Sequence, residues 1–456
     1  MPTNPIGLPS PEPPPHCKGY PLVGILPNML LDGPSELVRL ARQHPGKVCT
    51  STLGPLRFYL VTHPEHVQEV LADKWQNFGK GGMYRTMRRL LGNSLFTSEG
   101  DEWVRHRRLM QPLFTSKYLA SLAATIAQVV TNTIPRYGAA ADAGAELDMV
   151  KEMAHLGEGI IIETMFSGSI TPSESATLAE SFVVAVDTLL SRMFVSFLPS
   201  WFPLPGERAL RQALTTIDEV MLRLIRAPRS GGAPRNDLLS LLLSAKDNQL
   251  AEVDAQQVRD HLVTLFIAGS ETSADTMTWL FYILATHPEV QEKLRTEVAS
   301  ALGGRTPEFS DLANLPYTRM VIMETIRLYP AGWFFPRFSK EDDTIGGTAI
   351  PGGSTILLSP YVTHRDPALW PEPNSFLPER FAAERSAARP RFAYLPFGGG
   401  PHQCIGMQFA LILTQMVTAM LVQRFRPSLV PGQRVVPKGR GSLKPRHGLK
   451  LVFTRV

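Results

Sequence analysis

A single cysteine, Cys404, follows a run of glycines and precedes an apolar segment near the C-terminus. Residues 397–406 read FGGGPHQCIG, and the apolar residues from Ile405 to Leu421 predict a helix directly after the cysteine. Glycine has no Cβ, so this backbone can adopt positive φ and approach a flat ligand closely. The N-terminus of a helix carries a partial positive charge, which favours thiolate over thiol. We therefore expect an accessible thiolate at this bend, with backbone N–H groups directed at its sulfur.

Two interpretations of Cys404 follow from these residues alone. A thiolate held open beneath a flat surface is the ligand that haem iron takes in oxygen-activating enzymes. A glycine-rich turn can equally precede a structural cysteine, which behaves as a small buried hydrophobe. The full pattern F-x-x-G-x-x-x-C-x-G is much more specific than either part, and it resembles the cysteine loop of the cytochrome P450 superfamily.

Four further segments resemble motifs of the same superfamily and occur in its order along the chain. They are W-x-x-x-R at Trp103–Arg107, AGSET at Ala268–Thr272, E-x-x-R at Glu324–Arg327 and PERF at Pro378–Phe381. Each is short enough to recur by chance, but five in the correct order at plausible separations argue for membership. The resemblance extends from about Gly19 to the C-terminus.

The predicted domain organisation depends on these motifs. A length of 456 residues alone suggests about three domains. Trp103, Thr272 and Cys404 must all reach one cofactor, however, so we expect a single domain over residues 19–456 after a proline-rich tail at residues 1–18. The resemblance implies the cytochrome P450 fold, which is mainly α with a smaller β part and forms a triangular prism of helices around a buried haem.

Composition excludes several other classes of protein. Hydrophobic residues make up 44% of the chain and charged residues 19%, which argues against disorder. Three cysteines are too few for a disulfide framework, so Cys17 and Cys49 are expected to be free thiols of a reducing, cytoplasmic compartment. The N-terminus has no signal-peptide pattern, and no segment approaches the ~20 apolar residues of a membrane span. We therefore expect no membrane anchor. Nucleic-acid binding is disfavoured because no basic run is interleaved with aromatic residues.

Periodicity and breaker residues predict mostly helices. We expect a flexible loop at Pro228–Pro234 and a connection without regular structure at Gly79–Gly100, and Asp237 is a candidate N-cap. The predicted strands are Leu56–Thr62 and, with turns, Phe338–Leu358. The predicted helices are His63–Trp75, Glu102–Phe114, much of Leu147–Arg226 with breaks near Gly168 and Pro199–Gly206, Asp254–Leu284, Pro288–Leu302 and Tyr317–Tyr329.

The long central helix contains a glycine that costs about 1 kcal/mol relative to alanine. Thr272 lies four residues after Ala268, so its hydroxyl can bond that carbonyl and bend the helix, which would leave room for dioxygen. The alternative is a close helix crossing at Gly269 and a solvated Glu271. By resemblance, Glu271 and Thr272 deliver protons during oxygen cleavage and act as catalytic residues together with Cys404.

Glu324 and Arg327 lie one helical turn apart. An exposed pair at this spacing is worth only a few tenths of a kcal/mol. The resemblance supplies Arg380 as a third member, and we predict a network that supports the haem site structurally.

The cofactor implied by the resemblance is haem b, with Cys404 as its metal ligand. The candidates for holding its two carboxylates are Trp103, Arg107, Arg337 and His402, of which His402 departs from the usual arginine. A histidine still donates one hydrogen bond. Phe397 is expected to shield the sulfur from water. The other residues implied to contact the cofactor are Ala268, Gly269, Thr272, Gly398, Ile405 and Gly406.

The resemblance implies a haem-thiolate monooxygenase that inserts one atom of dioxygen into an apolar substrate. A terpene, fatty acid, steroid or macrolide would fit. Exposure is expected for three arginines that could otherwise anchor a carboxylate, namely Arg85, Arg88 and Arg89. A peroxide-driven or rearranging enzyme usually lacks the acid and alcohol pair, and a non-enzymatic haem sensor or carrier needs neither that pair nor an electron-partner surface. The segments expected to line the pocket are Met83–Leu95, Ser181–Phe197, Phe266–Thr272, Ala331–Phe335 and Ser442-Leu443.

Electrons are expected from a separate soluble ferredoxin or flavodoxin with its reductase, and the protein is expected to be a monomer. A basic cluster and the net charge of +5 fit the docking of an acidic carrier, although such a cluster is more often a solvated face. The cluster consists of Arg105, Arg107, Arg108 and Lys117.

Overall fold

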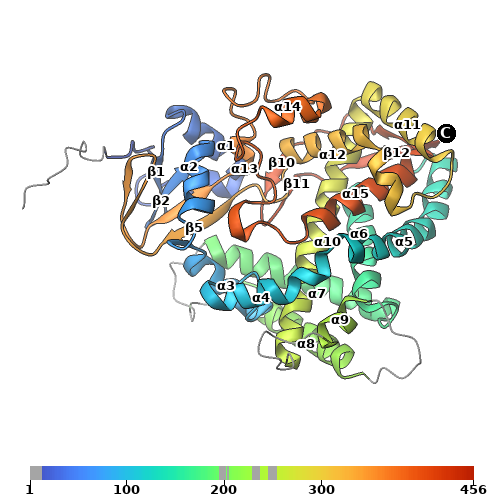
Figure 1. Cartoon of the computed structure of the whole chain (residues 1–456), viewed down its shortest axis with the longest axis horizontal. Helices are drawn as coiled ribbons and strands as arrows, with labels where there is room; N and C mark the ends of the chain where they lie inside the picture. Colours follow the sequence, from blue (N-terminus) through green and yellow to red (C-terminus); the bar gives the residue numbers. More distant parts are fainter. Residues whose placement is uncertain (1–12, 195–201, 203–204, 228–236, 245–253) are drawn as a thin grey trace, which may run out of the picture. The chain divides into compact units, whose positions relative to one another are not determined.

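A computed structural model describes residues 13–194, 202, 205–227, 237–244 and 254–456. The chain forms two compact units, and each is assembled from segments that are separate in the sequence (Figure 1). Unit 1 holds the residues up to 81 together with 334–373 and 390–403. Unit 2 holds residues 82–333, 374–389 and 404–456. Whether residues 19–456 act as one domain stays a prediction.

Unit 1 is built on a five-stranded sheet with the order β1-β2-β8-β5-β3. Its only parallel pair is β2 with β8, and the other neighbours are antiparallel. The apolar side chains of this unit form one core, to which Phe392 and Leu395 contribute from the segment before the glycine run. The start of the cysteine loop is therefore anchored in the core of unit 1. The strands are β1 (Cys49–Leu53), β2 (Leu56–Val61), β3 (Phe78–Gly79), β5 (Phe335–Ser339) and β8 (Thr355–Leu358), with a hairpin of β6 (Asp343–Ile345) and β7 (Thr348–Ile350). The helical elements are α1 (Leu26–Gln43), α2 (Pro64–Gln68), the π-helix η1 (Glu69–Asp73), α13 (Pro360–Thr363) and the short 3₁₀ turn η5 (Gly400–His402).

Unit 2 is mainly helical and is organised around α10 (Ala255–Thr286), which is buried along most of its 32 residues. The helices that pack against it include α6 (Met149–Phe166), α8 (Glu207–Arg226), α12 (Pro316–Leu328) and α15 (Met407–Val422). The other helices described in this unit are α3 (Gly81–Leu91), α4 (Gly100–Met110), η2 (Gln111–Phe114), α5 (Ser116–Asp142), α7 (Pro172–Phe194), α9 (Leu238–Ser244), α11 (Pro288–Leu302), η3 (Phe309–Asn314), η4 (Pro378–Phe381) and α14 (Ala383–Ala387).

Two small sheets complete unit 2. One has the order β4-β12-β9 and the other is the hairpin β10-β11. Their strands are β4 (Glu146–Asp148), β9 (Phe425–Leu429), β10 (Pro437–Gly439), β11 (Leu443–Pro445) and β12 (Lys450–Arg455). Among the described residues no single helix is long and apolar enough to cross a membrane, and one bent pair, Gly100–Phe114 with Ser116–Asp142, reaches that length and hydropathy jointly.

Most predicted elements are confirmed. The predicted central helix differs from α10 by two residues or fewer at each end, and its N-cap Asp254 accepts a hydrogen bond from the Gln257 N–H at 2.7 Å. Asp237 likewise accepts from the Ser240 N–H at 2.7 Å. The loop at Pro228–Pro234, and part of the break at Pro199–Gly206, lie outside the described residues.

The prediction of an irregular connection at Gly79–Gly100 was wrong, because α3 occupies Gly81–Leu91. Met87, Leu90 and Leu91 are buried, at the i, i+3, i+4 spacing that places side chains on one face of a helix. The three arginines of the segment point to solvent on the remaining surface. Two shorter predictions also shift: α15 begins at Met407, two residues later than expected, and the helix from His63 continues after α2 as the π-helix η1.

The predicted Glu324–Arg327–Arg380 network is present in unit 2. Glu324 and Arg327 are fully buried, and their side chains make two hydrogen bonds of 2.7 and 2.8 Å. Arg380 approaches Glu324 at 3.3 Å. The Leu377 N–H also donates to Glu324 at 2.9 Å, and Arg327 donates to the Ser375 carbonyl at 3.1 Å. An exposed pair of little energetic value is thereby excluded, because the network ties α12 to the segment that contains η4.

We expect Glu324→Gln to destabilise the protein by about 3–5 kcal/mol, because it leaves two buried arginines without their counter-charge. Glu292→Gln is the matched control, since Glu292 pairs with Arg426 at 2.7 Å on the surface. That exposed pair should be worth about 1 kcal/mol or less. Denaturant-induced unfolding of the two variants measures the difference, and equal losses would contradict the structural role of the network.

Candidate functional site

Cys404 lies between the turn η5 and the first residue of α15, and its side chain is exposed. The N–H groups of Gly406 and Met407 hydrogen-bond to its sulfur. Desolvation by the protein atoms around it is the largest influence and raises the pKa of the thiol, while these N–H groups and Arg107 lower it. The backbone N–H groups that the sequence predicted at this sulfur are confirmed and favour thiolate, but desolvation outweighs their effect on the pKa in this structure.

Cys404 is nevertheless suited to a metal. A coordinated cation deprotonates a thiol outright, which removes the cost that desolvation imposes on the anion. Cys17 and Cys49 are both buried, and burial raises the pKa of each thiol. Cys404 is thus the one cysteine of the chain with an exposed side chain. An accessible sulfur that also receives two backbone N–H groups fits the thiolate ligand of a haem iron.

The glycine run supports the cysteine loop by packing. Gly398 and Gly400 have φ values of +69° and +65°, as the sequence predicted. A Cβ on Gly400 would collide with the carbonyl of Leu71 in η1, and one on Gly399 would collide with the ring of Phe392. In unit 1 the close approach that these glycines permit is therefore to the protein itself.

The candidates for holding haem carboxylates fall on both units. In unit 2, Trp103 is buried and Arg107 is half-buried one turn later on α4. Desolvation lowers the pKa of Arg107, and Cys404 raises it. In unit 1, Arg337 is buried on β5 and donates to the Pro336 carbonyl at 2.9 Å. The half-buried His402 lies with its ring centroid 5.4 Å from that of Trp75.

The remaining predicted contacts with the cofactor divide in the same way. Phe397 and Gly398 belong to unit 1. Ala268, Gly269, Thr272, Cys404, Ile405 and Gly406 belong to unit 2. A Cβ on Gly406 would lie 3.7 Å from the Phe114 ring and 4.0 Å from the Cys404 sulfur, which is ordinary van der Waals contact, so packing alone does not require glycine at this position.

The hydroxyl of Thr272 donates to the carbonyl of Ala268 at 2.6 Å, which confirms the predicted bond. Helix α10 is continuous through these residues. A Cβ on Gly269 would lie 2.7 Å from Cδ1 of Ile161 on α6, so this glycine permits a close helix crossing. The packing interpretation of Gly269 is therefore sufficient to explain its presence, whereas its contact with the cofactor stays a prediction.

Glu271 is half-buried, and its carboxylate contacts two neighbouring side chains. Its Oε1 accepts a hydrogen bond from the Ser442 hydroxyl at 3.0 Å and lies 2.7 Å from Nζ of Lys444. Both partners come from the region of β11, which also accepts a 2.8 Å bond from the Trp279 indole at the Leu443 carbonyl. Lys444 lies 173 positions from Glu271 in the chain, so no local pattern indicates that the two are partners.

One turn after Glu271, α10 carries a second carboxyl that the sequence reasoning missed. Asp275 is only 4% exposed, and burial raises its pKa to about 7. Lys444 lowers this pKa and Glu271 raises it, and a hydrogen bond donated by the Ser442 hydroxyl would lower it as well. Two carboxyls of α10, Glu271 and Asp275, therefore form a cluster with the Ser442 hydroxyl and the Lys444 ammonium group.

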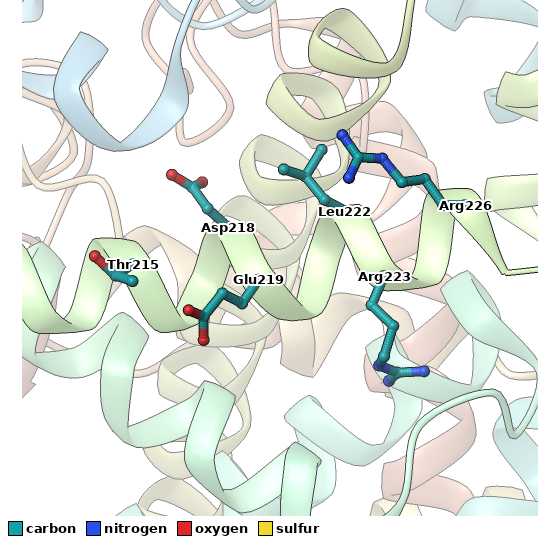
Figure 2. A pocket seen from close by; sticks show the side chains of 6 residues that line it. All are labelled: Thr215, Asp218, Glu219, Leu222, Arg223 and Arg226. Atoms are coloured by element: carbon teal, nitrogen blue, oxygen red, sulfur yellow. The ribbon is translucent and has the colours of Figure 1, made fainter.

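A separate pocket lies along α8 and contains none of the predicted haem residues (Figure 2). Two of its charged groups pair with residues outside the pocket: Asp218 with Arg259 at 2.5 Å, and Arg223 with Glu174 at 2.6 Å. A surface that carries both signs of charge on a single helix does not suit an apolar cofactor. It is lined by Thr215, Asp218, Glu219, Leu222, Arg223 and Arg226.

Comparison with known proteins agrees with this site. The family model of cytochrome P450 matches residues 13–453, so the chain belongs to the cytochrome P450 family. It is 36% identical to cyclooctat-9-en-7-ol 5-monooxygenase of Streptomyces melanosporofaciens over 389 residues, which cover 85% of this chain and 84% of the relative. It is 29% identical to pentalenene oxygenase of Streptomyces avermitilis, with 90% of each chain covered.

Solved structures show the same fold. The haem domain of cytochrome P450DA matches with a TM-score of 0.89 at 23% identity, covering 97% of each chain. A second cytochrome P450, CYP102L1, matches with a TM-score of 0.83 at 24% identity, over 98% of this chain and all of the other. The fold is therefore the cytochrome P450 fold, mainly α with a smaller β part. The chain is a haem-thiolate monooxygenase that acts on an apolar substrate, and enzymes of this family use a redox partner.

Thr272→Ala should lower the product formed per NAD(P)H several-fold and release more hydrogen peroxide, because an ordered proton donor is lost. Haem content and substrate affinity should stay close to those of the wild type. The control is Thr276→Ala, which removes an equivalent hydroxyl bonded to the Thr272 carbonyl at 2.8 Å. Equal coupling of NAD(P)H consumption to product in both variants would show that Thr272 only shapes the helix.

Proposed function

We propose that this enzyme binds haem b and hydroxylates a cyclic, terpene-type hydrocarbon with electrons from a separate ferredoxin or flavodoxin. Bound haem supplies the iron chemistry that activates dioxygen. Cys404 would hold the iron, and Phe397 would keep water from the sulfur. The haem carboxylates would be held by Trp103, Arg107, Arg337 and His402.

The substrate class rests on two buried aromatic rings of unit 2, which belong to segments predicted to line the pocket and would form an apolar wall of it. The rings of Phe182 on α7 and Phe266 on α10 stack with centroids 4.4 Å apart, and both are buried. An apolar wall with few polar groups suits a ligand that is mostly hydrocarbon.

Other segments predicted to line the pocket meet at the hairpin β10-β11. The Leu443 N–H donates to the Ala331 carbonyl at 3.1 Å, and the Trp333 indole donates to the Arg440 carbonyl at 3.0 Å. A Cβ on Gly441 would collide with Leu190 of α7. These contacts hold the hairpin β10-β11 against α7 and the residues around Ala331. A pocket with such fixed walls would select substrates by their shape.

The arginines of α3 favour a hydrocarbon over a fatty acid. Arg85, Arg88 and Arg89 are exposed, as expected. Arg88 donates to the Thr97 carbonyl at 3.2 Å, and Arg89 pairs with Glu207 at 2.5 Å. With these contacts made, two of the three arginines are poorly placed to anchor a substrate carboxylate.

The acid and alcohol pair on α10 supports the monooxygenase over the alternatives. Glu271 would pass protons from solvent, and Thr272 would hold a proton at its hydroxyl. A peroxide-driven or rearranging enzyme does not need this pair, nor does a haem sensor. The relatives named as an oxygenase of pentalenene and a monooxygenase of cyclooctat-9-en-7-ol support a terpene-type substrate.

The test is a panel of cyclic terpenes, a fatty acid, a steroid and a macrolide, scored by displacement of the haem water ligand and by incorporation of ¹⁸O₂. We expect one labelled oxygen atom in a cyclic terpene, and only when a carrier and its reductase are present. Phe266→Leu should weaken terpene binding about tenfold, whereas Phe281→Leu on the same helix should not. Turnover of the fatty acid or macrolide alone, or full turnover with peroxide alone, would contradict the proposal.

The carrier would dock on the basic side of α4. Arg105 and Arg108 are exposed there, as is Lys117 at the start of α5, while Arg107 is half-buried. Positive charge at this position would steer an acidic carrier and raise its association rate.

Reversing two of these charges, Arg105→Glu with Arg108→Glu, should slow reduction by the carrier at low salt. The difference from wild type should shrink at high salt, because screening weakens the native attraction. The control is Arg208→Glu with Arg211→Glu, which reverses two exposed charges of α8 and changes the net charge equally. Stopped-flow reduction measures both variants. If both are slowed alike, net charge and not this surface steers the carrier.

A further inference from the structure

Asp275 is a buried carboxyl on the same face of α10 as Glu271, since residues four apart lie one above the other on a helix. Its Oδ2 has no hydrogen-bond partner among the described residues. An ionised carboxylate that is buried with an unsatisfied oxygen is costly, so the neutral acid is favoured here.

Ser442 connects the two carboxyls. Its hydroxyl donates to Glu271 at 3.0 Å and also lies within hydrogen-bonding reach of Asp275. A serine hydroxyl has a single proton to donate. That proton is directed to Oε1 of Glu271, which also lies 2.7 Å from Nζ of Lys444. Toward Asp275 the Ser442 oxygen can therefore act as an acceptor, which requires Asp275 to be the donor.

The balance of charge around Lys444 points the same way. The carboxyls that interact with this one ammonium group come from three helices: Glu271 and Asp275 from α10, Asp187 from α7 and Glu158 from α6. Burial alone would lower the pKa of Lys444, but Asp275 and Glu271 raise it. Burial also raises the pKa of Glu158, which His155 and Lys444 lower. One ammonium group cannot neutralise four carboxylates, so the most deeply buried acid retains its proton.

We propose that Asp275 stores a proton and passes it through the Ser442 hydroxyl to Glu271, which makes Asp275 a positioning residue for proton delivery. In this step the O–H bond of Asp275 breaks as its proton moves to Oγ of Ser442. The original Ser442 proton moves at the same time to Oε1 of Glu271. Asp275 is left as a carboxylate beside Lys444, and a hydronium ion from solvent restores its proton. The role in catalysis rests on the proposed monooxygenase function.

The protonation state can be tested without turnover, on the haem-loaded full-length protein. Infrared difference spectra of wild type against Asp275→Asn should show a protonated carboxyl C=O band that shifts in D₂O, is present at pH 6 and is lost on titration near pH 7. Glu158→Gln and Asp187→Asn should retain this band. Its absence from the wild type at pH 6, or its equal loss in Glu158→Gln, would overturn the inference.

Stability gives a second readout that does not depend on activity. Because the pKa of Asp275 is raised from 3.8 to about 7 in the folded state, the cost of ionising this buried acid is absent below about pH 3.8 and reaches its full value above about pH 7. The unfolding free energy of the wild type should therefore fall relative to that of Asp275→Asn as pH rises from about 4 to 7. A difference that does not vary with pH would contradict a stored proton.

The relay itself is tested by coupling. Asp275→Asn and Ser442→Ala should both lower product per NAD(P)H several-fold and flatten the pH profile of coupling that the wild type shows near pH 7. Ser442→Thr keeps the hydroxyl and should restore coupling. A wild-type pH profile in both Asp275→Asn and Ser442→Ala would overturn the relay. If the wild type forms no oxygenated product at all, the proposed function fails, whereas the infrared band still decides whether Asp275 holds a proton.

Discussion

The enzyme depends on one cysteine sulfur that is open to a ligand and still poorly hydrated. Desolvation raises the pKa of the Cys404 thiol even though two backbone N–H groups and Arg107 lower it. The charge of a bound iron would offset this cost and stabilise the thiolate. Such a sulfur suits a metal ligand, because metal binding removes the cost of ionising the thiol. The glycines before Cys404 allow close packing of the backbone in unit 1. The fully buried Glu324–Arg327 pair holds the backbone around α12 in unit 2.

Neighbouring residues of helix α10 have different roles: one allows close helix packing, and others are proposed to deliver protons. Gly269 allows α6 to approach closely, and Thr272 satisfies its hydroxyl on the Ala268 carbonyl. Glu271 turns toward Lys444 and the hairpin β10-β11. The same hairpin also contacts α7 and the residues around Ala331. The segments proposed to face the substrate and to deliver protons are thus joined at one hairpin, so changes in the hairpin should affect both.

The sequence predicted the fold well where the signal was local. The long apolar periodicity of α10 and the breaker residues around α11 located their ends to within about two residues. It failed at α3, where glycines and arginines concealed the buried Met87, Leu90 and Leu91. The motifs located Cys404, Thr272 and Glu271, but they contained no information about Ser442 bonding to Glu271 or about Lys444. Such contacts between distant segments arise from tertiary packing, as does the burial that perturbs Asp275.

The central claim is that Cys404 ligates the haem iron as a thiolate. The most direct measurement is the absorption spectrum of the reduced, CO-bound protein for Cys404→Ser beside Cys17→Ser and Cys49→Ser. The account predicts that the thiolate signature disappears in Cys404→Ser alone and persists in the two variants of the buried cysteines. A thiolate signature that survives in Cys404→Ser would contradict it.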